Sequence, residues 1–214
     1  MEFIDPDLQH YVELHSGDEN ELLAKVNRET HLSVLKPRML SGQLQGRMLS
    51  MISHMIRPQY ILEVGTYTGY SALCFAEGMI ENGKLVTIDI NEELEDRVKG
   101  YFAESGYGDK IEMKIGPADQ LIPQLDYVWD LVFIDADKIN YGLYYDLVID
   151  RVAQNGFIIV DNVLWSGKVL EKYRKKLDED TAAILAFNKK VHDDPRVENV
   201  LFPVRDGLMI LRKK

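Results

Sequence analysis

Cysteine is nearly absent from this sequence: Cys74 is the only one in 214 residues. A single cysteine excludes an internal disulfide and fits a reducing compartment. Long apolar runs are also missing, since the longest, at 131–134 and 157–160, fall far short of the roughly 20 residues that a membrane-spanning helix needs. The N-terminal residues lack the basic start and apolar core of a signal peptide. We therefore expect a cytoplasmic protein with no membrane segment.

Basic residues are in deficit, with 25 Lys and Arg against 35 Asp and Glu, which gives a net charge of −10. Such a surface repels phosphate backbones, which disfavours a dedicated nucleic-acid binder. The strongest local cluster of basic charge is KVLEKYRKKL at 168–177, which fits either a solvated helix face or a site for an anionic substrate tail. Internal repeats and a Pro-, Gly- or Ser-rich linker are lacking as well, so we predict a single domain over 1–214.

The apolar pattern changes along the chain. Helical spacing with a break at Pro37 predicts an N-terminal helical extension over 1–57. A core over 58–214 follows, in which short apolar runs alternate with amphipathic stretches, and this predicts an α/β fold with a doubly wound, mostly parallel sheet. The tail at 198–214 predicts an antiparallel hairpin that turns at 205–207. The predicted strands are 60–64, 84–89, 110–115, 130–135 and 156–161, and the predicted helices are 70–80, 92–105, 117–125 and 139–153.

A glycine turn follows the first predicted strand. Gly65 and Gly69 allow a tight turn before a helix, but their spacing differs from the glycine pattern that binds the pyrophosphate of dinucleotides. Glu63 would repel a diphosphate, and Asp89 ends the second strand where an acid accepts ribose hydroxyls. Together these residues favour S-adenosylmethionine over NAD, although the two glycines alone would also fit an ordinary turn.

Oxygen-bearing side chains end two later strands. Asp135, Asp161 and Asn162 can converge at one edge of the sheet, and carboxylate and amide oxygens suit Mg²⁺, Ca²⁺ or Mn²⁺. The alternative is that the two aspartates cap the helices that follow. Lys138 is either a surface lysine at a helix start or, beside a metal-bound phenol, the base that takes its proton. Trp165 could line an aromatic substrate or belong to the core, and Cys74 fits a packed thiol better than a nucleophile.

Four motifs in this order carry a family resemblance: LEVGTYTGYSAL (62–73), VTIDIN (86–91), FIDADK (133–138) and DNVLW (161–165). From about Pro37 to its end the chain resembles the cation-dependent O-methyltransferases of the caffeoyl-CoA and catechol type. The resemblance implies the Rossmann-like class I methyltransferase fold, metal ligation by Asp135, Asp161 and Asn162, and catalysis by Lys138 with Asp135. The cofactor contacts that it implies are Ser41, Glu63, Gly65, Thr66, Ser71, Asp89, Ile90, Ala118, Asp135 and Asp137.

The same resemblance implies a small, catechol-like hydroxylated acceptor and a homodimer. Plant members have an asparagine that contacts the substrate about where this chain has Ser166, so a plant-type substrate does not follow. Some bacterial relatives instead methylate a hydroxylated wobble uridine in tRNA, an alternative that the net charge disfavours and the basic run favours. A non-catalytic subunit that binds S-adenosylmethionine is a further alternative, and the complete set of metal-ligating residues argues against it.

Overall fold

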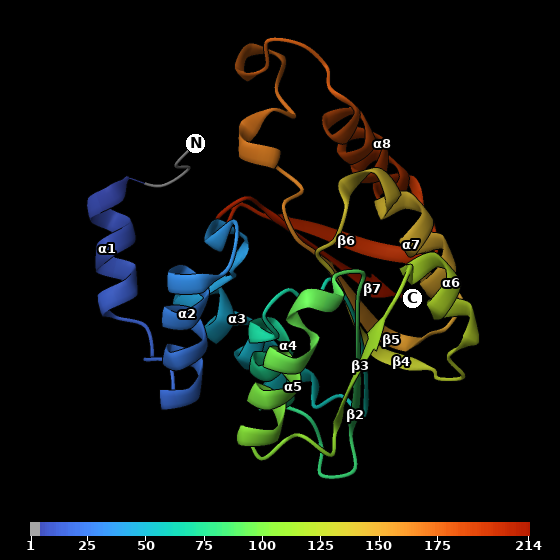
Figure 1. Cartoon of the computed structure of the whole chain (residues 1–214). Coiled ribbons are helices and arrows are strands. Elements are labelled where there is room, and N and C mark those ends of the chain that lie inside the picture. Colours follow the sequence, from blue (N-terminus) through green and yellow to red (C-terminus); the bar gives the residue numbers. More distant parts are fainter. Residues whose placement is uncertain (1–4) are drawn as a thin grey trace. The chain divides into compact units, whose positions relative to one another are not determined.

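The computed structural model describes residues 5–214, which divide into two compact units, one ending at Pro117 and the other covering Ala118–Lys214. The strands form a seven-stranded, mostly parallel sheet with flanking helices, which confirms the predicted α/β fold (Figure 1). The single domain over 1–214 stays a prediction. Within the described part of the chain, no helix is both long and apolar enough to cross a membrane.

The unit that ends at Pro117 begins with helices, as the apolar spacing predicts. Their ends follow local chemistry: the Asn20 side chain accepts the Leu23 N–H at 2.9 Å to start the second helix, and a 3-10 turn that begins at Pro37 separates it from the third. The bounds are α1 Pro6–Leu14, α2 Glu21–Ser33, η1 Pro37–Met39 and α3 Gly42–Ile56.

Three parallel strands follow in the order β3-β2-β1. Most apolar side chains of β1 and β2 are buried, as is Ile111 at the start of β3. Every residue of the helix after β1 is buried too, because that helix lies inside the layer of helices rather than on the surface. The elements are β1 Tyr60–Val64, α4 Tyr70–Ala76, β2 Lys84–Asp89, η2 Glu92–Leu94, α5 Glu95–Glu104 and β3 Ile111–Ile115. The strands predicted at 60–64, 84–89 and 110–115 are thus confirmed.

In the second unit, β4 and β5 are parallel, while β7 runs antiparallel to both β5 and β6. The strand order β4-β5-β7-β6 confirms the C-terminal hairpin. The elements are α6 Ala118–Leu121, η3 Ile122–Gln124, β4 Trp129–Ile134, η4 Lys138–Asn140, α7 Tyr141–Ile149, β5 Val152–Val160, η5 Trp165–Gly167, η6 Glu171–Tyr173, α8 Glu179–Asp193, β6 Val197–Phe202 and β7 Leu208–Lys213.

The helix predicted over 139–153 is too long. Helix α7 ends at Ile149 and β5 already begins at Val152. The register of β5 against β4 jumps from Trp129–Val152 to Leu131–Phe157, so the intervening residues form a bulge, in which Asn155 has a φ of 62°. The polar residues of this bulge hide the start of the strand from an analysis of apolar runs.

The basic run at 168–177 is not a helix face. Only the short 3-10 turn η6 lies within it, and the helix of this region, α8, starts after it and was not predicted (Figure 1). Asp178 starts α8 by accepting the Thr181 N–H at 2.8 Å. Phe187 of α8 then meets the edges of Tyr141 and Tyr145 on α7, with ring centroids 5.7 and 6.3 Å apart. This packing fixes the helix that begins close to the end of β4.

A largely buried ion pair joins α3 to the end of α4. The Arg47 guanidinium donates to both oxygens of Glu77 at 2.9 and 3.1 Å, and Ser50 and Asn20 donate to the same carboxylate. Because Glu77→Ala would leave a partly buried arginine without its partner, we expect the free energy of unfolding to fall by about 3 kcal/mol. Urea unfolding measures this loss, and the matched variant of the exposed Glu81, Glu81→Ala, should change it little. Equal stability of the two variants would contradict the prediction.

Candidate active site

Several residues in the turn between β1 and α4 have a positive φ, which is the left-handed backbone region. Gly65 has a φ of 103° and Gly69 a φ of 77°, values that favour glycine. Gly69 also lies so close to α5 that a Cβ there would come within 2.9 Å of both Phe102 and Val98. The predicted glycine turn is therefore present, and its second glycine serves close packing as well as the turn.

Asp89, at the end of β2, holds this turn in place. Its Oδ2 accepts the backbone N–H groups of Thr66 and Tyr67 at 3.0 and 2.7 Å, and its Oδ1 accepts the N–H of Asn91 at 2.9 Å. Each carboxylate oxygen has two acceptor positions. These three bonds use both positions of Oδ2 and one of Oδ1, so Asp89 keeps one acceptor position toward a ligand.

Glu63 is fully buried at the end of β1. The hydroxyls of Ser71 and Thr87 donate to its two oxygens at 2.6 and 2.5 Å, and the hydroxyls of Thr87 and Thr66 lie 2.5 Å apart. The structure thus brings together Glu63, Ser71 and Thr66 from the predicted set. It adds Thr87, which sequence reasoning missed, although Thr87 lies directly opposite Glu63 in the paired strands.

The remaining predicted residues of this unit lie differently. Ser41 is buried at the start of α3, where its hydroxyl makes no capping hydrogen bond to the helix. Ile90 follows Asp89 and is 74% exposed, a high value for a large apolar side chain. Its apolar surface is therefore open to solvent.

In the second unit, Asp135 and Asp161 come directly after neighbouring strands. Ile134 and Val160 are paired in register, and the Asp161 N–H donates to the Ile134 carbonyl at 3.0 Å. Paired strands lie about 4.8 Å apart, so the two aspartates are close neighbours at one edge of the sheet. Asn162 follows with a φ of 61°, and its N–H donates to the Asp161 carboxylate at 2.6 Å.

Asp135 does not cap the helix that follows β4. The residue at the N-cap position of η4 is Asp137, which makes no capping bond, and Asp135 instead accepts from the Lys138 ammonium at 3.0 Å. Across residues 5–214, no group of three or more His, Cys, Asp and Glu side chains is placed to hold a metal ion. The predicted set contributes only two carboxylates, because its third member is the amide of Asn162.

Lys138 is 9% exposed and donates a second hydrogen bond, at 2.6 Å, to the hydroxyl of Tyr141. Tyr141 in turn donates to the backbone carbonyl of Asp161 at 2.9 Å, and burial raises the pKa of its phenol well above the ordinary value. Sequence reasoning missed Tyr141. A signal for it existed, because Tyr141 lies three residues after Lys138 at the start of a helix, where such a pair shares one face.

The two other predicted residues of this unit are Asp137 and Ala118. Asp137 is exposed and accepts hydrogen bonds from Asn140 and from the hydroxyl of Tyr144, both at 2.6 Å. Burial, followed by this hydrogen bond, raises the pKa of Tyr144 above its ordinary value. Ala118 is buried at the first position of α6. Asp137 is therefore held in position by α7, while Ala118 can offer only a small apolar surface.

The loop after Asn162 places an aromatic ring beside Lys138. The indole of Trp165 has the Lys138 ammonium 5.8 Å and the Lys168 ammonium 5.6 Å from its ring centroid. Trp165 and Ser166 both have left-handed backbones, with φ of 47° and 53°. The Ser166 N–H donates to the Asp206 carboxylate, and burial raises the pKa of that carboxyl. Trp165 thus lies next to the candidate catalytic lysine, and Lys168 links the basic run to the same ring.

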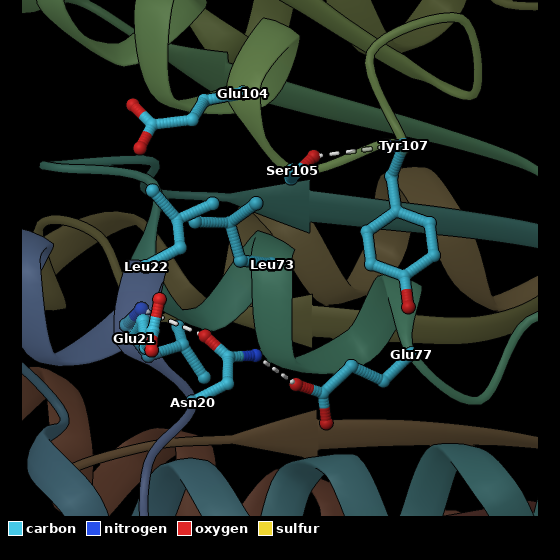
Figure 2. Close-up of a pocket in the computed structure, with 9 residues that line it drawn as sticks. Asn20, Glu21, Leu22, Leu73, Glu77, Glu104, Ser105 and Tyr107 are labelled. Atoms are coloured by element: carbon cyan, nitrogen blue, oxygen red, sulfur yellow. Dashed lines mark hydrogen bonds between the residues drawn. The ribbon is translucent and has the colours of Figure 1, made fainter.

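A pocket of about 340 Å³ lies elsewhere, between the start of α2, α4 and the end of α5 (Figure 2). It is lined by apolar leucines and by glutamates, of which Glu77 belongs to the ion pair with Arg47. None of the predicted site residues lines it. Cys74 is buried, and burial raises the pKa of its thiol to about 12, so the thiol stays protonated as expected for a packed cysteine.

Comparison with known proteins identifies a family that this chain matches. The O-methyltransferase family matches residues 13–214. A caffeoyl-CoA O-methyltransferase of Petunia hybrida is 36% identical over 179 residues, which cover 79% of this chain and 74% of the relative. A probable caffeoyl-CoA O-methyltransferase of Dictyostelium discoideum is 29% identical over 93% of this chain and 88% of its own.

Solved structures agree over nearly the whole chain. An S-adenosylhomocysteine-bound methyltransferase of Podospora anserina is 27% identical, covers 100% of both chains and has a TM-score of 0.90. An O-methyltransferase of Bacillus cereus, also in complex with S-adenosylhomocysteine, is 25% identical, covers 97% of both chains and has a TM-score of 0.88. The matched family spans both units, so this chain belongs to the O-methyltransferase family.

Proposed function

We propose that this chain is an S-adenosylmethionine-dependent and divalent-metal-dependent O-methyltransferase that acts on a catechol-like or other small hydroxylated acceptor. The observation that carries the proposal is the pairing of Asp135 and Asp161 at the ends of two hydrogen-bonded strands, with the Lys138 ammonium on Asp135. Two oxygen-ligand carboxylates and a candidate base at one sheet edge suit transfer to an acidic hydroxyl rather than to nitrogen or carbon.

The cofactor half of the proposal rests on the glycine turn and its two acids. Glu63 would hold the amino end of the methionine part, because its carboxyl group lies at the end of β1 beside the glycine turn and the hydroxyls of Ser71 and Thr87 fix its position. Asp89 has one acceptor position left for a ribose hydroxyl, while its other bonds keep the turn rigid. Exposed Ile90 would lie against adenine, with Ala118 on the same ring. Ser41, Gly65, Thr66, Ser71, Asp135 and Asp137 complete the proposed cofactor contacts.

The proposed metal ligands are Asp135, Asp161 and Asn162, whose carboxylate and amide oxygens match the preference of Mg²⁺, Ca²⁺ or Mn²⁺. When bound, a divalent cation supplies the charge that lowers the pKa of a nearby hydroxyl from about 10, so that it reacts at neutral pH. The neighbouring strands hold the two aspartates in position beforehand.

Lys138, once it has lost a proton to become a neutral amine, is proposed to take the proton of the acceptor hydroxyl. Its amine lies between Asp135 and Tyr141 and against the indole of Trp165, which would also form one wall for a flat acceptor. Holding the acceptor in line with the methyl group can supply roughly 7–11 kcal/mol of the barrier, so positioning would contribute most of the rate.

The test is a methyl-acceptance screen with labelled S-adenosylmethionine. We expect transfer to catechol or caffeate, or to a CoA ester of caffeate, with Mg²⁺ present, and at least about a 100-fold loss of transfer in excess EDTA. Restoring Mg²⁺ should restore the rate, which is the control for damage by the chelator. Activity that persists in EDTA would contradict metal dependence.

The other arms of the screen separate the alternatives. Transfer to total tRNA but not to the small acceptors would replace the proposed acceptor with a modified uridine. Binding of S-adenosylhomocysteine without transfer to any acceptor would favour a non-catalytic subunit. The family resemblance also leads us to propose that the protein is a homodimer in the cytoplasm. Sedimentation velocity at several concentrations measures whether it is a dimer.

A further inference from the structure

Tyr141 is the buried group most closely tied to Lys138. It is 0% exposed, and its ring packs edge-on against Phe187. Its hydroxyl touches both Lys138 and the backbone of Asp161, so it bridges the candidate base and the end of β5.

The hydrogen bonds of this hydroxyl can run in only one direction. A backbone carbonyl can only accept, so the single proton of Tyr141 is committed to the Asp161 carbonyl at 2.9 Å. The tyrosine oxygen must therefore accept from Lys138, whose nitrogen lies 2.6 Å away. One N–H of Lys138 is held on Tyr141 whether the lysine carries its extra proton or not.

The second direction at the lysine nitrogen is also fixed, because Asp135 Oδ1 lies 3.0 Å away and a carboxylate only accepts. With both neighbours in place, the tetrahedral nitrogen has one defined remaining position, which carries a proton or a lone pair. Lysine is a flexible chain with three rotatable donors, so with Asp135 alone this position would have no fixed direction.

We propose that Tyr141 is a positioning residue for Lys138: its hydroxyl, oriented by the Asp161 carbonyl, aims the remaining position of the lysine nitrogen at the acceptor hydroxyl. The inference rests on the proposed role of Lys138 as the base. In this proposal the Asp161 carbonyl orients the Tyr141 hydroxyl, and this hydroxyl orients Lys138. The end of β5 would therefore supply a metal ligand, the Asp161 carboxylate, and also set the direction of proton transfer.

Helix α7 supplies a matched control. Tyr145 is also buried on α7 and edge-on to Phe187, but its hydroxyl donates to Asp194 at 2.9 Å, away from Lys138. With caffeate and Mg²⁺, Tyr141→Phe should lower kcat by about 10- to 100-fold and leave the KM for caffeate and the affinity for S-adenosylhomocysteine within twofold. Tyr145→Phe should leave kcat within twofold. Thermal unfolding of both variants measures the purely structural effect.

A double-mutant cycle tests whether Tyr141 acts through Lys138. If it does, adding Tyr141→Phe to Lys138→Ala should slow the enzyme no further than Lys138→Ala alone. Losses that multiply, or a Tyr141→Phe enzyme with the parent kcat, would overturn the inference. A fully active Lys138→Ala enzyme would overturn both it and the role of Lys138 as base.

A measurement that does not depend on catalysis distinguishes the positioning role of Tyr141 from the proposed methyltransferase function. In ¹H–¹⁵N spectra of the lysine side chains at low pH and temperature, an ordered Lys138 should give a signal that Lys138→Ala removes. We expect Tyr145→Phe to keep this signal and Tyr141→Phe to lose or broaden it. Were the signal unchanged in Tyr141→Phe, the positioning role would be wrong even if methyl transfer is metal-dependent. Loss of the signal with no methyl transfer in the parent would overturn the proposed function alone.

Discussion

Asp161→Asn is expected to lower kcat by at least about 1,000-fold and to remove the dependence on Mg²⁺, because it replaces a charged ligand of a hard cation with a neutral one. The substitution keeps the size of the side chain and an oxygen that can accept the Asn162 N–H. Asp161 is 4% exposed, so its carboxylate is held away from bulk water. Initial rates against Mg²⁺ concentration measure the effect.

Two comparisons make this result specific. Titration with S-adenosylhomocysteine should give an affinity within twofold of the parent, since Asp161 is not among the proposed cofactor contacts. Asp150→Asn, at an exposed aspartate that pairs with Arg196, should leave both kcat and Mg²⁺ dependence unchanged. A variant of Asp161 that keeps metal-dependent turnover would show that this carboxylate does not hold the cation.

Glu63→Gln is expected to weaken binding of S-adenosylhomocysteine by about 100-fold, which corresponds to about 2.7 kcal/mol. The variant keeps the shape of the side chain but removes the charge that would face the amino group of the cofactor. The amide also turns one oxygen into a donor, so either Ser71 or Thr87 loses the acceptor that its hydroxyl now uses. Isothermal titration calorimetry measures the affinity.

Glu104→Gln serves as the control in the same unit, because Glu104 is half exposed and pairs with Lys25 at the surface. Its affinity for the cofactor product should match that of the parent. Thermal unfolding of both variants separates a loss of binding from a loss of fold. If folded Glu63→Gln bound S-adenosylhomocysteine as tightly as the parent, the carboxylate would have only a structural role.

Much of the fold could be predicted from the sequence, because apolar periodicity reports burial directly. Strands such as β1 and β2 match their apolar runs residue by residue. The prediction failed where another effect outweighed periodicity. The bulge near Asn155 interrupts the apolar run of β5, so the start of this strand was not predicted. Helix α8 was not predicted either, because the residues 168–177 were interpreted by their charge and the N-cap at Asp178 was not recognised.

The candidate site could be predicted only in part. The type and position of a residue in the sequence show its charge, but they do not show which side chains it contacts. The acids at strand ends were visible because parallel strands bring their carboxyl ends to one edge. The partners of these acids were not. Thr87 and Tyr141 are ordinary core residues in the sequence, and only the paired register and the first turn of α7 show that their hydroxyls reach Glu63 and Lys138.

The left-handed backbone at Trp165 and Ser166 has a consequence for how this protein could be stabilised. Such conformations cost roughly 1–2 kcal/mol per non-glycine residue. Glycine at Ser166 would relieve this strain in the folded chain, but it would also let the segment sample many more backbone shapes. Selecting variants for heat resistance alone would therefore loosen the indole that is now fixed next to Lys138, the ring that we propose as one wall for a flat acceptor.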